Sequence, residues 1–221
     1  MKKIIALLGD HYHDKRLLQK SLMKAMEKLK LESGVLRIEY IEVEQLAEKL
    51  QEKPDAVILS KQNKRNPTAE NVEYWMDEKL EKQICEYVHS GGGWLVWHSG
   101  LSSYEVREDY YSMVKGKFDF HPSELLDVAY QWNNTDDNLR ILDAAYNVRD
   151  EHYFVTCEER KTNVFLHAIS EKGKTVAGWK HEYGKGRVIC LTPSHTEEGL
   201  LHDEFTNLLF SSLTWCCGKL A

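Results

Sequence analysis

The stretch Gly91-Gly92-Gly93-Trp94-Leu95-Val96-Trp97-His98-Ser99-Gly100 decides the fold of this chain. Its glycines predict a tight turn, the apolar run after them predicts a short buried strand, and the small residues around His98 predict an abrupt bend. In an open α/β sheet, such a bend lifts one side chain above the carboxyl end of a central strand, where ligands bind. We therefore expect His98, followed by Ser99, to stand at a ligand-binding edge.

The sequence before this stretch alternates strand and helix patterns. In chain order we predict a strand at Lys3–Leu8, a helix over Lys15–Leu31, an outer strand at Val35–Val43, a helix around Gln45–Glu52, a strand at Ala56–Ser60, and a long helix that Thr68 caps and that ends near His89. Alternation of this kind predicts an α/β fold with a doubly wound, mostly parallel sheet.

The pattern is looser after Gly100. We predict a helix at Tyr104–Val114, short strands or ordered loop at Lys115–Pro122 and Val128–Trp132, a polar turn at Asn133–Asn138, strands at Val164–Ser170, Thr175–His181 and Arg187–Thr192, and a last helix that Asp203 caps and whose inner face carries Phe205, Leu208, Leu209, Ser212, Leu213 and Cys216. Gly184-Lys185-Gly186 predicts a hairpin turn. No linker divides the chain, so we expect one domain over residues 1–221.

Composition excludes several classes of partner. The net charge of −6 offers no basic surface for nucleic acid, and no apolar segment is long enough to cross a membrane. The apolar run near the N-terminus is too short for a signal peptide and predicts a first strand, so we expect a cytoplasmic protein. Five cysteines without metal-type spacing are expected to be reduced thiols, mostly buried. The sequence leaves open whether the chain forms a homo-oligomer.

His98 is the first candidate for chemistry because of its position at the strand tip. Hydrolases and amidotransferases built on such sheets carry Ser or Cys there. An imidazole would instead supply a base, an acid or a metal ligand. Ser99 is the alternative nucleophile, although no Gly-x-Ser-x-Gly pattern encloses it.

Further candidates follow other predicted strands. His11 and His13 follow the first strand and alternate, so we expect only one of them to point into a cleft; Asp14 beside them is expected to cap the next helix. His195 follows a late strand, which would place it on the same edge as His98 if the two strands are parallel neighbours. Three such histidines with Glu151 would suffice for an acid/base cluster or a divalent metal site, the metal ligands being His98, His195 and Glu151. Aromatic residues near these positions could stack on a sugar or simply fill the core: Tyr12, Trp94, Trp97, Tyr104, Tyr153 and Trp179.

The ordered set of motifs resembles the ThuA-like family of trehalose utilisation over nearly the whole chain. The resemblance rests on Gly91–Ser99, Gly116-Lys117-Phe118-Asp119-Phe120-His121-Pro122, Asp150-Glu151-His152-Tyr153, the segment Gly178–Val188 and Ser194-His195. It implies a fold like that of class I glutamine amidotransferases, flavodoxin-like and three-layered, without the amidotransferase cysteine. It also implies that His98, Glu151, Tyr153 and His195 line the pocket, with His121 nearby and His11 or His13 from the first loop.

Two hypotheses for function follow. The first is an enzyme acting on a small carbohydrate, trehalose or a related keto-glycoside, by acid/base chemistry. His98 would serve as base or ligand, Glu151 and His195 as its partners, and Tyr153 as a hydrogen-bond donor. The substrate-binding residues would be His11, His13, Ser99, His121 and Trp97. The second hypothesis is a non-catalytic sugar-binding or regulatory protein. A glutamine amidotransferase is not expected, because no cysteine stands at the strand tip.

Overall fold

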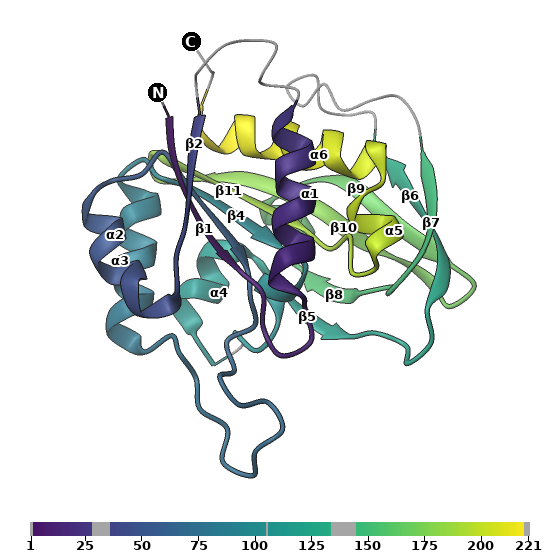
Figure 1. Ribbon diagram of the computed structural model, residues 1–221, viewed down its shortest axis with the longest axis horizontal. Helices are drawn as coiled ribbons and strands as arrows, with labels where there is room; N and C mark the ends of the chain where they lie inside the picture. The colour runs from purple at the N-terminus through teal and green to yellow at the C-terminus, as the bar shows by residue number, and fades with distance from the viewer. Residues whose placement is uncertain (1, 28–35, 105, 134–144, 219–221) are drawn as a thin grey trace.

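The computed structural model describes residues 2–27, 36–104, 106–133 and 145–218. At its centre is a nine-stranded sheet in the order β2-β1-β3-β4-β11-β10-β9-β6-β7 (Figure 1). Its strands are β1 (Lys2–Leu8), β2 (Leu36–Tyr40), β3 (Ala56–Ser60), β4 (Gly93–Trp97), β6 (Leu126–Trp132), β7 (Tyr146–Asp150), β9 (Asn163–Ser170), β10 (Gly173–Tyr183) and β11 (Gly186–Leu191). A separate antiparallel pair joins β5 (Gly116–Phe120) to β8 (Phe154–Cys157).

The sheet has a parallel half and an antiparallel half. Strands β2, β1, β3, β4 and β11 pair in parallel, whereas β11, β10, β9, β6 and β7 pair antiparallel. The predicted α/β fold with a mostly parallel central sheet is confirmed, and the antiparallel strands extend it at one side. The predicted hairpin is also present, since β10 turns into β11 at Gly184, whose φ is +61°.

Helices cover both faces of the parallel half, which makes the molecule three-layered. The helices are α1 (Lys15–Glu27), α2 (Leu46–Gln51), α3 (Glu78–His89), α4 (Glu108–Val114), α5 (Glu197–Leu200) and α6 (Asp203–Cys216), with short 3-10 turns that include η3 (His98–Leu101). Helices α1 and α6 lie together on one face (Figure 1). Along β4, Leu95 and Trp97 pack toward these two helices, whereas Trp94 and Val96 pack toward α2, α3 and α4. Every residue of β3 and β4 is buried, as the apolar runs predict.

Three helix starts differ from the prediction. Helix α4 begins at Glu108 and not at Tyr104. The long helix begins at Glu78 instead of near Thr68, and its cap is Asp77, whose side chain accepts a hydrogen bond from the Leu80 N–H. Turn chemistry explains the difference, because the Asn66 side chain accepts from the Glu73 N–H and holds residues 66–73 as a loop. Asp203, the predicted cap of the last helix, is instead its first residue, and the capping residue is His202, whose Nδ1 accepts from the Glu204 N–H.

Other predictions agree more closely. Asp14 caps α1 by accepting from the N–H groups of Arg16 and Leu17, and all six residues predicted for the inner face of α6 are buried. Part of the first predicted helix and all but Asn133 of the predicted turn at Asn133–Asn138 lie outside the described residues. No helix in the described part of the chain has the length and apolar character needed to span a membrane.

Candidate active site

The site lies where the parallel strands end. Strand β4 finishes at Trp97, and His98 opens η3 with a left-handed backbone, φ +48°. Gly100 allows this bend, because a Cβ at that position would lie 2.2 Å from the carbonyl oxygen of Leu59. The end of β4 therefore turns sharply against β3, and the His98 ring projects beyond the sheet.

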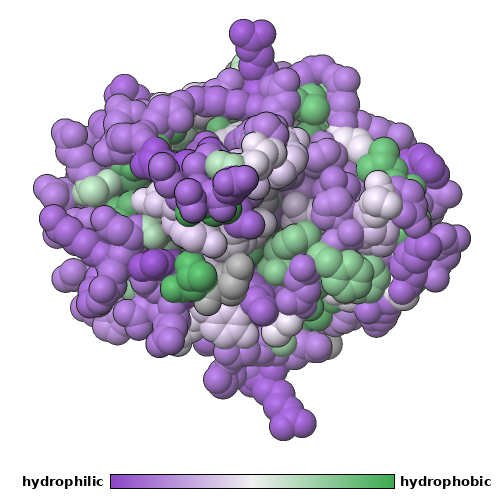
Figure 2. All heavy atoms as spheres, turned by 90° about the horizontal axis from the view of Figure 1, so that it is seen from below, coloured by the Kyte–Doolittle hydropathy of each residue, from purple (hydrophilic) through white to green (hydrophobic). Residues whose placement is uncertain are grey.

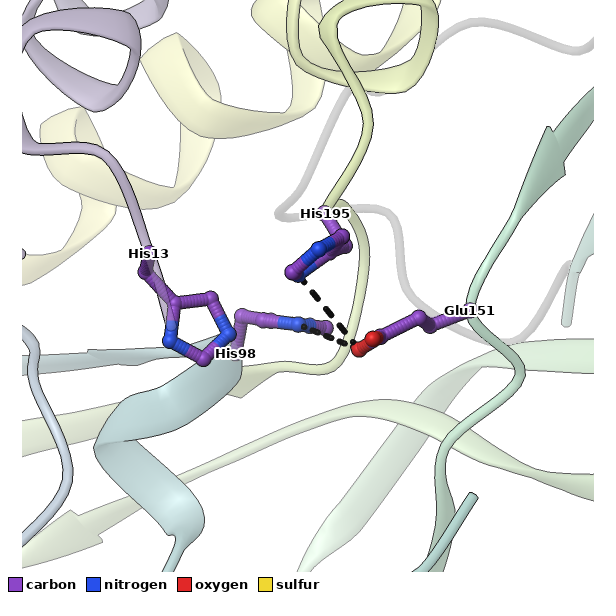
Figure 3. A group of neighbouring side chains, drawn as sticks. All are labelled: His13, His98, Glu151 and His195. Atoms are coloured by element: carbon purple, nitrogen blue, oxygen red, sulfur yellow. Dashed lines mark ion pairs between the residues drawn. The ribbon is translucent and has the colours of Figure 1, made fainter. Parts of the chain in front are cut away.

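His98 is held in one orientation. Its side chain is fully buried, its ring stacks on that of Tyr153 with 3.9 Å between centroids, and its Nδ1 lies 2.6 Å from the carbonyl oxygen of Thr192. A carbonyl can only accept, so Nδ1 carries the proton and donates it. The other ring nitrogen, Nε2, points to the Glu151 carboxylate, with 3.3 Å between Nε2 and Oε2 (Figure 3).

His195 reaches the same carboxylate from the neighbouring strand. Strand β11 pairs with β4 in parallel, so the loop after β11 lies at the same edge as His98, as the sequence predicts. The His195 Nδ1 lies 3.5 Å from the Glu151 Oε2. Asp150 ties this loop to the end of β7, since its buried carboxylate accepts from the N–H groups of His195 and Thr196.

His13 completes the group from the loop after β1. Its ring contacts those of His98 and His195, with 5.1 and 5.0 Å between centroids. Its Nδ1 lies 2.7 Å from the Asp10 Oδ1. This oxygen also accepts from the Tyr12 N–H, and the other oxygen, Oδ2, accepts from the Gln62 N–H. Burial by itself would raise the pKa of Asp10, but the hydrogen bond with His13 and these N–H donors lower it. The remaining nitrogen of His13, Nε2, is left to face the cluster.

The Glu151 carboxylate carries the negative charge of the cluster. Burial would raise the pKa of its carboxyl, but the nearby rings of His98, His195 and His121 lower it to about 2. Burial lowers the pKa of both His98 and His195. The cluster therefore combines an ionised carboxylate with two imidazoles, those of His98 and His195, whose charged forms burial disfavours.

Three ring nitrogens of the cluster are buried without a hydrogen-bond partner among the described residues: His13 Nε2, His98 Nε2 and His195 Nδ1. A buried polar atom left unpaired costs about 1–3 kcal/mol, so three at one point call for an occupant. With the Glu151 carboxylate they place four potential ligand atoms within 4.8 Å of one another. These four side chains are the ones in the described residues that could hold a metal ion.

A cavity of about 390 Å³ opens above the cluster and is lined by Tyr12, His13, Gln62, Ser99, Ser102, Phe118, His121, Glu151, Tyr153 and His195. It lies on the face where the parallel strands end, where apolar and moderately polar side chains gather inside a hydrophilic border (Figure 2). Burial raises the pKa of Tyr153 well above its usual range, so its hydroxyl stays protonated. The cavity thus has aromatic side chains at its sides and the charged Glu151 carboxylate at its base.

The structure brings most of the predicted site residues together. His13, Ser99, His121, Glu151, Tyr153 and His195 line the cavity, and His98 lies behind them, closed off from solvent. His121 Nε2 is 3.8 Å from the second Glu151 oxygen, Oε1.

Two predicted residues are placed elsewhere. His11 is exposed and does not line the cavity, so of the two alternating histidines only His13 lines it. Trp97 is fully buried in the core against Phe205, 5.6 Å between ring centroids, and does not contact the cavity. A strand buried on both faces carries no signal of which residue points to a ligand, and this explains the placement of Trp97.

Sequence reasoning missed Asp10, Gln62 and the carbonyl of Thr192. Asp10 stands directly after β1, between Gly9 with φ +84° and the two histidines, and this position was the available signal. A backbone carbonyl such as that of Thr192 carries no signal in a side-chain pattern.

Comparison with known proteins agrees with this fold. The model of the ThuA family, described as trehalose utilisation, matches residues 11–216. A ThuA-like protein from Parabacteroides merdae superposes with a TM-score of 0.74 at 14% identity, covering 100% of this chain and 91% of that one. A second, from Bacteroides uniformis, has a TM-score of 0.70 at 18% identity, with 98% and 91% covered. A cytoplasmic protein from Salmonella typhimurium LT2 has a TM-score of 0.65 at 15% identity, with 97% and 99% covered. No curated protein matches the sequence.

Proposed function

Because this chain belongs to the ThuA family of trehalose utilisation, we propose that it is an enzyme of carbohydrate utilisation that performs acid/base chemistry on a sugar. The observation that carries the proposal is the Glu151 carboxylate, set among imidazoles at the floor of an aromatic-walled cavity. The cavity lies within the usual size range of small-molecule sites, roughly 300–1,000 Å³. Its Tyr12, Phe118 and Tyr153 rings are suited to the apolar faces of a sugar.

A keto-sugar, trehalose-derived or related, suits these groups best. A carbonyl acidifies the neighbouring C–H bond, which lowers the demand on the base that removes the proton. Glu151, His121 and His195 face the cavity and can move that proton, while the protonated hydroxyl of Tyr153 can donate a hydrogen bond to a sugar oxygen. His98, the histidine in place of the amidotransferase cysteine, is fully buried and positions Glu151 from behind.

Cysteine chemistry has no support at this site. None of the five cysteines lines the cavity, and burial raises the pKa of the least buried, Cys157, to about 12. A thiol of that pKa is protonated at neutral pH and is a poor nucleophile. Glutamine hydrolysis is therefore not part of the proposal.

The proposed location is the cytoplasm. The cysteines are all unpaired thiols, which fits a reducing compartment, and one structural neighbour is described as a cytoplasmic protein.

The test is turnover of keto-glycosides and trehalose by the wild type and by Glu151→Gln. Glu151→Gln keeps the shape of the side chain and removes its charge, so we expect kcat to fall by about 10²–10⁴-fold with sugar binding largely kept. His11→Ala is the matched control, because His11 is exposed outside the cavity, and it is expected to behave as wild type.

The runner-up, a sugar-binding or regulatory protein, makes a different prediction. For such a protein, calorimetry should show saturable binding of a sugar by the wild type, which would not turn the sugar over. Glu151→Gln should then lose binding, with no turnover to lose. That result would reject the enzyme.

A further inference from the structure

We infer that His13, His98, His195 and Glu151 form a binding site for one divalent transition-metal ion of the late first row, such as Zn²⁺. The donor atoms are His13 Nε2, His98 Nε2, His195 Nδ1 and Glu151 Oε2 (Figure 3). The inference goes beyond the proposed function, because it concerns the same cavity but does not depend on which molecule enters it.

The ring orientations carry the inference. In His98, Nδ1 donates to the Thr192 carbonyl, so Nε2 holds a free lone pair. In His13, Nδ1 is engaged by the buried Asp10 carboxylate, so Nε2 is the inward nitrogen. Metal-binding histidines are oriented in this way, with the outer N–H given to a carboxylate or carbonyl and the inner nitrogen left for the ion.

The distances fit a shared ion better than direct pairing. A tetrahedral site with bonds of about 2.1 Å separates its ligand atoms by about 3.4 Å. The Glu151 Oε2 lies 3.3 Å from His98 Nε2 and 3.5 Å from His195 Nδ1, yet neither nitrogen makes a hydrogen bond within the described residues. An unprotonated Nε2 facing a carboxylate oxygen places two lone pairs against each other, and a cation between them removes that repulsion.

The donor set indicates which ion would bind. Imidazole nitrogens favour Zn²⁺, Cu²⁺, Ni²⁺ and Fe²⁺, whereas Mg²⁺ and Ca²⁺ require sites made of oxygen ligands. The ion would lie at the floor of the cavity, because His13, Glu151 and His195 line it and His98 closes the site from behind. A substrate oxygen entering the cavity would reach the ion from the open side, where a metal acts as a Lewis acid. With Glu151 and His195 engaged, His121 remains a cavity-facing imidazole that can move a proton.

The test is metal binding by the untagged, full-length protein. Metal content is measured after purification without chelator or metal resin, and the metal-free protein is then titrated with Zn²⁺ and with Co²⁺, whose visible absorption reports coordination. We expect one ion per chain. We expect Glu151→Gln and His195→Ala to weaken Zn²⁺ binding by at least about 100-fold, and the positioning variant Asp10→Asn by about 10–100-fold.

His11→Ala is the matched histidine control and should bind Zn²⁺ as the wild type does, since its side chain lies outside the cluster. Circular dichroism checks that each variant is folded. The inference is overturned if the folded wild type binds neither ion, or if Glu151→Gln and His195→Ala bind Zn²⁺ with unchanged affinity. Sugar binding to the metal-free protein is measured separately by calorimetry, so a failure of the metal site is distinguished from a failure of the proposed function.

Discussion

At the scale of single residues, the site is built from side chains held by partners outside it. His98 is oriented by the backbone carbonyl of Thr192, directly after the neighbouring strand β11, and His13 is oriented by Asp10. Asp150 fixes the loop that carries His195. The rings of His98 and His13 are therefore held by partners outside the cluster, as a preorganised site requires.

Another histidine, His181, has a purely structural role and supplies a test of stability against pH. Burial lowers its pKa to about 4, while its Nε2–H donates to the carbonyl of Met113 at 2.7 Å. Between the unfolded pKa of about 6.5 and the folded value, only the unfolded chain takes up the proton. The free energy of unfolding is therefore unaffected by His181 above about pH 6.5. It falls as the pH drops toward 4, by roughly 3 kcal/mol in all.

We expect His181→Gln to remove this part of the acid sensitivity. Urea unfolding of both proteins near neutral pH and at about pH 4.5 measures it. The wild type should lose more stability than the variant between the two conditions. Equal losses would mean that His181 titrates normally in the folded protein.

At the scale of elements, the bend between β4 and η3 determines where the His98 side chain lies. The backbone leaves the strand at Trp97, takes the left-handed conformation at His98 and passes against β3 at Gly100. Added atoms at Gly100 would collide with the backbone of Leu59 and with the Val96 side chain, at 2.2 and 3.1 Å. Contact with a fixed backbone cannot be relieved by a change of rotamer.

Gly100→Ala should therefore destabilise the protein by about 1–3 kcal/mol and displace the tip that carries His98. Thermal unfolding measures the first effect and substrate turnover the second. Ser102→Ala is the control for the melting temperature in the same loop, since it removes only a part-buried hydroxyl that lies 3.3 Å from the Ser103 hydroxyl. A Gly100→Ala protein with the melting temperature of the control would show that β3 and η3 can separate without cost.

At the scale of the whole molecule, one sheet carries two apolar layers. Leu95 packs in the layer under α1 and α6, whereas Val96 packs in the layer under α2, α3 and α4. Neither layer can keep its shape without the strands that it shares with the other. This sharing is the physical basis for expecting a single domain over residues 1–221.

Substitutions on the two faces test that expectation. Leu95→Ala should cost about 2–5 kcal/mol, and Val96→Ala less, because it removes fewer buried methyl groups. Calorimetry should show one transition that both substitutions lower. Two transitions, each moved by only one of the substitutions, would instead divide the chain into separate folding units.

What the sequence by itself determined was the layout of the parallel half and the edge at which chemistry could occur. Unbroken apolar runs such as Ala56–Ser60 specify strands buried on both faces, and residues that follow parallel neighbours, His98 and His195, must share one edge. Local turn chemistry was harder to interpret, as the late start of α3 shows. The Asn66 side chain holds a loop where the helix was predicted to begin, and Asp77, not Thr68, caps the helix.

Only the tertiary structure decided which of these side chains meet. It placed His13 in the cavity lining and left His11 exposed outside it, buried Trp97 in the core, and brought Asp10 and the Thr192 carbonyl to the outer nitrogens of two histidines. It also extended the parallel strands with an antiparallel half, whose edge strand β7 delivers Glu151 to the cluster. The His98–Thr192 contact joins residues 94 positions apart. Neither spacing nor periodicity encodes such a contact, because it depends on strand order and on how each element is rotated about its own axis.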